Sequence, residues 1–159
     1  MEITLKDALS EATAELDVPA FACKADLFRH MVTLLEKNGS VSDAEKFIQS
    51  LNRREAEAPT YMGEFVAIPH GKCDSVRRPT VAFLRLREPM WYESNDDAGE
   101  VSLIFMLAVP KEEASTGHLR MLANLSMLMM EEDFVQTLWK AESYQDIIQA
   151  FDRCSAEVE

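Results

Sequence analysis

The chain has 159 residues, of which 47% are hydrophobic, and this predicts a single globular domain over 1–159 with a buried core. The formal net charge of −12 disfavours direct binding to nucleic acid or to an anionic membrane surface, because both carry negative charge. Three cysteines without a repeating pattern, and an N-terminus without a secretory signal, indicate reduced thiols in a cytoplasmic protein. No apolar run reaches membrane-spanning length, so membrane insertion is not expected.

Two amphipathic helices are predicted in the first third of the chain. Over 22–38, apolar residues recur on one face (Leu27, Phe28, Met31, Leu34 and Leu35), and Gly39 ends the pattern. Ser42 followed by Glu45 forms a capping-box pattern, which predicts a second helix that starts there and ends near 53–55.

Three strands are predicted in the middle of the chain. A loop with Pro59 and Gly63 leads to the apolar run 65–68, which stops at a proline, a histidine and a glycine. Residues 80–86 are rich in β-forming side chains, and 101–109 are almost wholly apolar, which is typical of a strand buried on both faces. The turn-rich segment 88–100 between them is expected to be a loop.

Helices are predicted for the remainder of the chain. Pro110 ends the central strand, and Ser115 or Thr116 can cap a helix over about 117–130. Two further amphipathic helices are expected near 131–140 and 144–153. Strands and helices mixed through one domain predict an α/β sandwich, in which a sheet carries helices on both faces.

Three polar side chains are candidates for a common site. His70 follows the strand 65–68, where a neutral imidazole is well placed to act as a nucleophile, although a turn histidine without a function remains the alternative. His118 lies in the first turn of a helix that follows the central strand, and Arg54 ends the helix before the His70 strand. If the three meet, they form an anion site. His30, inside the first helix, is expected to be structural or to face solvent.

A metal site is the competing prediction. His70 and Cys73 have the two-residue gap of a zinc ligand pair. The other possible ligands (His118, Cys154, Cys23 and His30) are scattered singly, without a second closely spaced pair. The chain has no phosphate-binding or dinucleotide-binding glycine motif and no nucleophile elbow, so no cofactor is expected.

Motifs in a fixed order run through nearly the whole chain: Arg54-Glu55, 60–64, 67–72 (Ala-Ile-Pro-His-Gly-Lys), Trp91 with Glu93-Ser94, 101–110, His118-Leu119, 121–123, Asp133-Phe134 and 144–148. Together they resemble the enzyme IIA domains of the mannitol/fructose class of the bacterial sugar phosphotransferase system. The region around Trp91 is more similar to the fructose branch than to the mannitol branch. One difference stands out, because the family usually reads Gly-x-Gly before the apolar triplet, whereas here Gly63-Glu64 is followed by Phe65.

The resemblance implies that His70 accepts a phosphoryl group from the carrier HPr and passes it to a cysteine of an enzyme IIB. It implies that His118 and Arg54 line the phosphate, that the sheet is mixed, and that this cytoplasmic phosphotransferase needs no metal. Fructose-like sugar uptake is the leading expectation. The alternatives are a regulatory enzyme IIA paralogue that acts by phosphorylation-dependent protein binding, and a non-catalytic zinc-binding domain. Two interpretations of Phe65 stay open: its ring alters the approach to the active site, or it packs elsewhere. Both leave His70 intact, and the difference bears on partner fit and transfer rate.

Overall fold

The computed structural model describes residues 4–111 and 115–158, with side chains described for 4–111 and 120–154. Within this part of the chain, one sheet of six strands has the order β1-β5-β6-β3-β2, and β4 pairs with β6. The strands are β1 (Leu9–Val18), β2 (Tyr61–Gly63), β3 (Phe65–Ala67), β4 (His70–Cys73), β5 (Thr80–Ser94) and β6 (Asp97–Pro110). The helices are α1 (Leu5–Ala8), α2 (Lys24–Lys37), α3 (Ala44–Glu55), α4 (Ser115–Leu128), α5 (Glu132–Lys140) and α6 (Tyr144–Val158).

The sheet is mixed, as expected. β5 and β6 form a long antiparallel pair, while β1 runs parallel to β5, and β3 and β4 both run parallel to β6. β2 pairs antiparallel with β3 at the edge. The connection from β1 to its parallel neighbour β5 contains α2 and α3, whereas β3 and β4 reach their parallel neighbour β6 through β5, without a helix in between.

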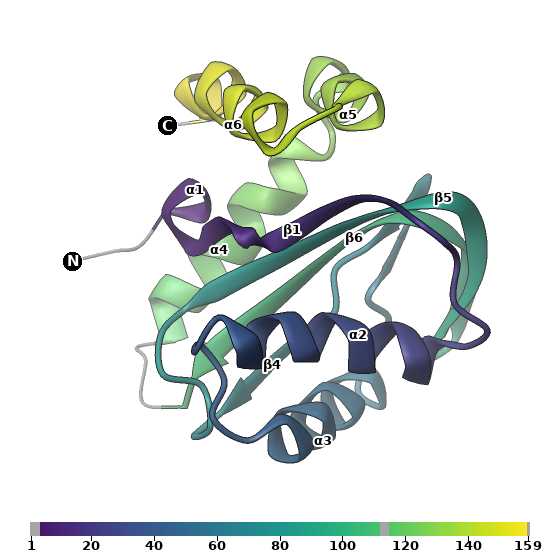
Figure 1. Cartoon of the computed structure of the whole chain (residues 1–159), viewed down its shortest axis with the longest axis vertical. Coiled ribbons are helices and arrows are strands. Elements are labelled where there is room, and N and C mark those ends of the chain that lie inside the picture. The colour runs from purple at the N-terminus through teal and green to yellow at the C-terminus, as the bar shows by residue number, and fades with distance from the viewer. Residues whose placement is uncertain (1–3, 112–114, 159) are drawn as a thin grey trace.

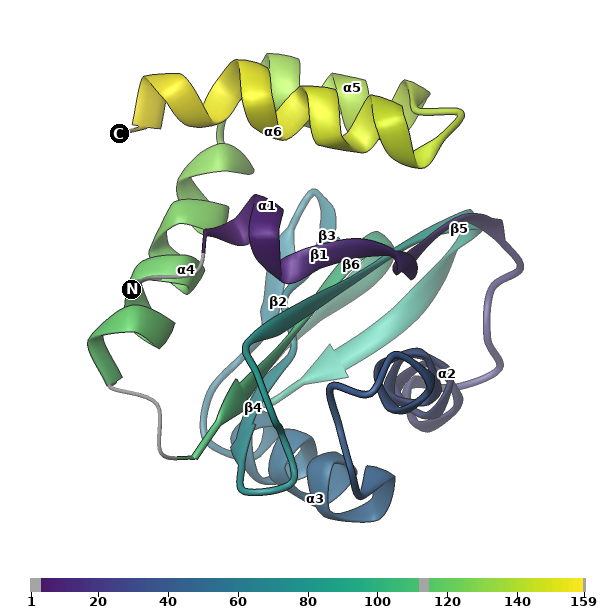
Figure 2. The same ribbon diagram turned by 60° about the vertical axis from the view of Figure 1, so that its left-hand side comes forward.

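Helices cover both faces of the sheet (Figures 1 and 2). α2 and α3 pack on one face, and α1, α4, α5 and α6 lie on the other. Alternate β6 side chains enter the two cores: Leu103, Phe105 and Leu107 on the α4–α6 side, and Ile104, Met106 and Ala108 on the α2–α3 side. Burying each large apolar side chain contributes about 1.5–3 kcal/mol, so β6 stabilises both layers at once. The predicted fold class and the doubly buried central strand are confirmed.

The segment 88–100 is not a loop. β5 continues to Ser94 and β6 begins at Asp97, so the two strands form a hairpin with an irregular register between Arg85 and Met90. Gly99 is a packing residue here, because a Cβ atom at this position would lie 2.2 Å from the Tyr61 hydroxyl oxygen. The prediction failed for two reasons. Some of the residues typical of turns lie where the pairing of β5 and β6 is bulged, and Gly99 is needed for close packing against Tyr61.

Three smaller expectations need correction. Asp43, not Ser42, caps α3, with its carboxylate accepting a hydrogen bond from the Lys46 amide at 3.2 Å. Ser42 instead donates to the Ser75 carbonyl through its amide and its hydroxyl.

The loop predicted before β3 contains β2, and the chain before α2 contains α1 and β1, for which no element was predicted. The predicted cap at Ser115 or Thr116 lies outside the described side chains.

None of the described helices combines the length and the apolar character needed to span a lipid bilayer.

Candidate functional site

His70 lies at the start of a short strand rather than at the end of one. β3 ends at Ala67, and His70 opens β4, where it pairs with Leu107 of β6. The Leu107 amide donates to the Pro69 carbonyl at 3.0 Å, so proline interrupts the ladder without releasing the chain from the sheet. The histidine is therefore held rigidly and is only 7% exposed.

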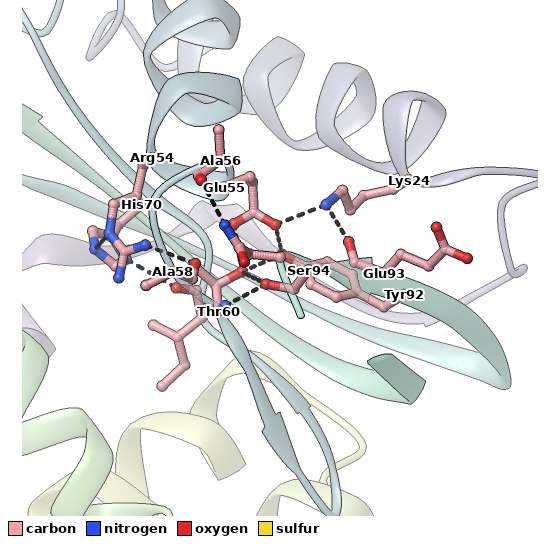
Figure 3. Close-up of polar contacts among 12 residues, drawn as sticks. Lys24, Arg54, Glu55, Ala56, Ala58, Thr60, His70, Tyr92, Glu93 and Ser94 are labelled. Atoms are coloured by element: carbon pink, nitrogen blue, oxygen red, sulfur yellow. Dashed lines mark hydrogen bonds and ion pairs between the residues drawn. The ribbon is translucent and has the colours of Figure 1, made fainter. Parts of the chain in front are cut away.

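Two of the contacts of the His70 imidazole fix its tautomer (Figure 3). Nδ1 lies 3.0 Å from the Ile68 carbonyl oxygen, which can only accept, so Nδ1 carries a proton. Nε2 lies 3.0 Å from Arg54 Nε, which can only donate, so Nε2 presents its lone pair. The ring is therefore neutral, with Nε2 as its nucleophilic atom.

Arg54 is held in this position by its own second contact. It comes from the last turn of α3, and its Nη1 donates to the Ala58 carbonyl at 2.9 Å (Figure 3). One planar guanidinium thus joins the loop after α3 to the His70 ring. The structure thus brings together two of the three residues that the sequence suggested for a common site.

Gly71 allows α3 to approach β4 closely enough for that contact. A Cβ atom on Gly71 would lie 2.4 Å from Ser50 Oγ and 3.2 Å from the Phe47 ring, both on α3. Gly71 is not among the residues with positive φ, so close approach rather than an unusual backbone angle explains this glycine.

Of the other two histidines, the structure describes the side chain of His30 only. His118 belongs to α4, but its side chain lies outside the described part of the chain, so its distance from His70 stays untested. His30 forms a 2.6 Å contact with Glu15 and packs against the Phe21 ring, in keeping with the structural role expected for it.

The zinc alternative gains no support from the geometry. Cys73 Sγ lies 3.2 Å from Ser75 Oγ, in an ordinary buried polar contact. Across the residues that the structure describes, no three histidine, cysteine, aspartate or glutamate side chains gather where they could hold one metal ion.

Comparison with known proteins identifies the family. Residues 9–154 match the family "Phosphoenolpyruvate-dependent sugar phosphotransferase system, EIIA 2". The chain belongs to this enzyme IIA family. It is an enzyme IIA of the fructose/mannitol class, as the sequence motifs predicted.

Two relatives and one solved structure illustrate the match. The fructose-specific EIIABC component of Bacillus subtilis is 36% identical over 93% of this chain, which spans only 22% of that relative. The fructose-specific EIIA component of Haloferax volcanii is 36% identical over 79% of this chain and 80% of its own length. The crystal structure of the nitrogen regulatory protein IIA-Ntr from Neisseria meningitidis superposes with a TM-score of 0.80 at 30% identity, covering 91% of this chain and 97% of that one.

Phe65 occupies a strained position in this enzyme IIA. Its φ is 70°, and Gly63 and Glu64 before it also have positive φ, in a region that L side chains avoid. The ring is 42% exposed and meets the edge of Trp139 on α5 at 6.2 Å between centroids. Phe65 pairs with Val101 and His70 pairs with Leu107, six positions further along β6, so the two residues lie far apart on the sheet at roughly 3.3 Å per position. Phe65 therefore cannot touch a phosphate on His70.

A buried polar cluster next to Arg54 had no sequence prediction. The Glu55 carboxylate is 7% exposed and is surrounded by Lys24, Thr60 and Tyr92 (Figure 3). Burial, with the Glu55 carboxylate beside it, raises the pKa of the Tyr92 hydroxyl, which therefore stays protonated and able to donate. The only sequence signal was that Glu55, Thr60 and Ser94 fall within the family motifs.

Proposed function

We propose that His70 Nε2 accepts a phosphoryl group from the phosphohistidine of HPr and passes it to a cysteine of an enzyme IIB. In the first step a new P–N bond forms at Nε2, the P–N bond of the donor breaks, and its electron pair returns to the donor imidazole. The observation that carries the proposal is the Arg54 Nε to His70 Nε2 contact at 3.0 Å, with Nδ1 held by the Ile68 carbonyl.

The geometry suits a loose phosphoryl-transfer transition state. Such a transition state spreads negative charge over the equatorial oxygens, so the protein mainly positions the reactants and neutralises charge. Arg54 already presents a cation at the nucleophilic nitrogen, and its Nε–H must release the Nε2 lone pair and turn to the phosphate oxygens as the P–N bond forms. By resemblance to the family, we assign the second phosphate contact to His118, in the first turns of α4.

A role in fructose-like sugar uptake is the more specific part of the proposal. Both of the relatives described above carry the name fructose-specific, at 36% identity. We accordingly expect the chain to work in the cytoplasm, with an enzyme IIB as its acceptor.

A regulatory role is the second candidate. The Neisseria protein, which is 30% identical and covers most of this chain, is named a nitrogen regulatory protein. The same phosphohistidine would then switch the binding of other proteins, instead of feeding a permease.

Phosphoryl transfer from phosphoenolpyruvate through enzyme I and HPr tests the chemistry. We expect one acid-labile phosphate on the chain, none on His70→Ala, and full labelling of His118→Ala at a reduced rate. Phosphorus NMR should assign the phosphate to Nε2. Label retained on His70→Ala, or a phosphate on Nδ1, would contradict the proposal.

A phosphate-chase experiment distinguishes the sugar-uptake role from the regulatory role. The phosphorylated chain is mixed with a purified fructose-type enzyme IIB in the absence of HPr. Label that moves to the enzyme IIB cysteine favours transport, and label that stays on His70 favours regulation.

A further inference from the structure

We propose that Glu55 is a positioning residue for phosphoryl exchange, and that the buried cluster around its carboxylate fixes both Arg54 and His70. The proposal rests on the proposed function, because it concerns the same histidine. It assigns to Glu55 no contact with phosphate and no proton transfer.

Glu55 and Arg54 are neighbours at the end of α3, but their side chains go to different partners (Figure 3). Arg54 contacts His70, whereas Glu55 pairs with Lys24 of α2 at 2.8 Å. Because Lys24 neutralises the buried carboxylate, the guanidinium of Arg54 remains available to His70 instead of folding back onto Glu55. Lys24 is held in turn by the Glu93 carbonyl and by the Tyr92 ring, whose centroid lies 4.8 Å away.

The hydroxyl protons of Thr60 and Tyr92 can be assigned to specific hydrogen bonds. Thr60 donates its single hydroxyl proton to Glu55 Oε2, so in the 2.7 Å contact between Thr60 and Tyr92 the donor must be Tyr92. The Tyr92 hydroxyl lies 3.2 Å from Glu55 Oε1 and can share its proton with that oxygen. The carboxylate oxygens are thus satisfied by Thr60, Tyr92 and Lys24, and a buried carboxylate needs such partners.

Thr60 extends the cluster to His70. Its carbonyl accepts a hydrogen bond from the Ile68 amide at 2.9 Å, and the Ile68 carbonyl is the acceptor that holds His70 Nδ1. The Thr60 amide donates to Ser94 Oγ at 2.5 Å, which ties this loop to β5. Glu55 is therefore a covalent neighbour of Arg54 and is linked to His70 through Thr60 and Ile68. Displacing the carboxylate should disturb both ends of the Arg54–His70 contact.

The first experiment measures single-turnover transfer from phospho-HPr at saturating concentration in Glu55→Gln. A misplacement of about 1 Å can cost roughly 100-fold in rate, so we expect transfer to slow by about 10- to 100-fold while labelling of His70 still reaches completion. In an Arg54→Ala background the same substitution should change the rate less, because one of the two groups that it positions is gone and only the link to His70 through Thr60 and Ile68 remains. An unchanged rate in Glu55→Gln, or equal slowing in both backgrounds, would overturn the proposal.

A matched pair separates positioning from loss of stability. Thr60→Val and Thr13→Val each remove a buried hydroxyl, and Thr13 Oγ1 bonds to the Val81 carbonyl at 2.9 Å, away from α3. We expect Thr60→Val to slow transfer and Thr13→Val to leave it unchanged at similar cost in stability. Equal slowing in both variants would refute a positioning role. If Glu55→Gln fails to fold, Tyr92→Phe, which removes one hydroxyl and keeps the ring, takes its place.

Nitrogen NMR of the His70 ring tests the proposal without any transfer. In the unsubstituted chain the proton should reside on Nδ1, and Glu55→Gln should move part of it to Nε2. A chain that is never phosphorylated would refute the proposed function alone. A ring tautomer that is identical in both proteins would refute the positioning role alone.

Discussion

The two nitrogens of His70 differ because each has a different neighbour. The Ile68 carbonyl keeps the proton on Nδ1, and the lone pair of Nε2 accepts a hydrogen bond from the positively charged guanidinium of Arg54. A guanidinium stays charged throughout the physiological pH range, so the ring faces a permanent positive charge on its reactive side. Nε2 is therefore oriented by a group that also suits the incoming phosphate.

Replacing Arg54 by lysine should impair transfer even though the charge is kept. A lysine ammonium cannot reproduce the planar pair of contacts to His70 Nε2 and to the Ala58 carbonyl. Charge-assisted hydrogen bonds contribute about 1.5–3 kcal/mol, so we expect roughly 10- to 100-fold slower single-turnover transfer, measured by rapid quench. Arg53→Lys, at the exposed neighbouring residue, is the control and should transfer normally. Equal transfer rates for both variants would show that the planar guanidinium geometry of Arg54 has no role in transfer.

Phe65 allows a test of backbone strain. A side chain in the left-handed region costs roughly 1–2 kcal/mol, whereas glycine in ordinary backbone is less stable than alanine by about 0.5–1 kcal/mol. Both Phe65→Gly and Phe65→Ala lose the Trp139 contact, so their difference isolates the strain. We expect Phe65→Gly to be the more stable of the two in urea unfolding.

Met62 supplies the control for Phe65. It is also exposed, lies on β2 and has no positive φ, so Met62→Ala should be more stable than Met62→Gly. The same order at Phe65 would argue against strain there. Because Phe65 and His70 pair with positions of β6 that lie six residues apart, all four variants should be phosphorylated to completion.

Among the elements, the helices and the central strand were predictable because each has a strong period. α2 and α3 repeat apolar residues every three or four positions, and β6 is apolar on both faces. The hairpin end of β5 and β6 was missed because its residues respond to tertiary contacts, such as Gly99 under Tyr61. β1 was missed because its burial does not alternate and its register with β5 is irregular.

The site was predictable to a different extent. Motif order sufficed to place Arg54 next to His70, although the sequence put His70 at the end of a strand and the structure puts it at the start of β4. The cluster around Glu55 draws its partners from α2, the loop after α3 and β5, with Tyr92 37 residues away in the chain. No local pattern encodes such a contact, so only the fold reveals it.

The packing of α3 on β4 makes Gly71 a sensitive position. An added Cβ would meet Ser50 Oγ at 2.4 Å, and overpacking of this kind costs about 1–3 kcal/mol. We expect Gly71→Ala to lower the free energy of unfolding and to slow transfer, because α3 carries Arg54. Adding Ser50→Ala removes the nearest atom and should restore part of both losses, although the Phe47 ring at 3.2 Å still crowds the site. Simple additivity of the two substitutions would rule out Ser50 as the obstructing contact.

For the whole molecule, the acidic surface matters mainly for encounter with partners. The net charge of −12 favours a partner patch of opposite sign, as expected for the docking of HPr. At physiological ionic strength the screening length is about 8 Å, so charges around the site should dominate. The acidic side chain of Glu57 is exposed, and its amide bonds to the Arg54 carbonyl at 3.1 Å. Glu88, on β5, is equally exposed but belongs to a different part of the molecule.

Transfer from HPr at limiting concentration should therefore slow as salt is added, while single-turnover transfer at saturating HPr should change little. Salt screens the attraction that brings the proteins together and leaves the fixed Arg54–His70 contact intact. Glu57→Gln should lower the rate at limiting HPr and flatten its salt dependence, whereas the matched Glu88→Gln should behave like the unsubstituted chain. A rate that stays flat from low to high salt would exclude charge steering, and apolar contacts around the His70 strand would then have to account for recognition.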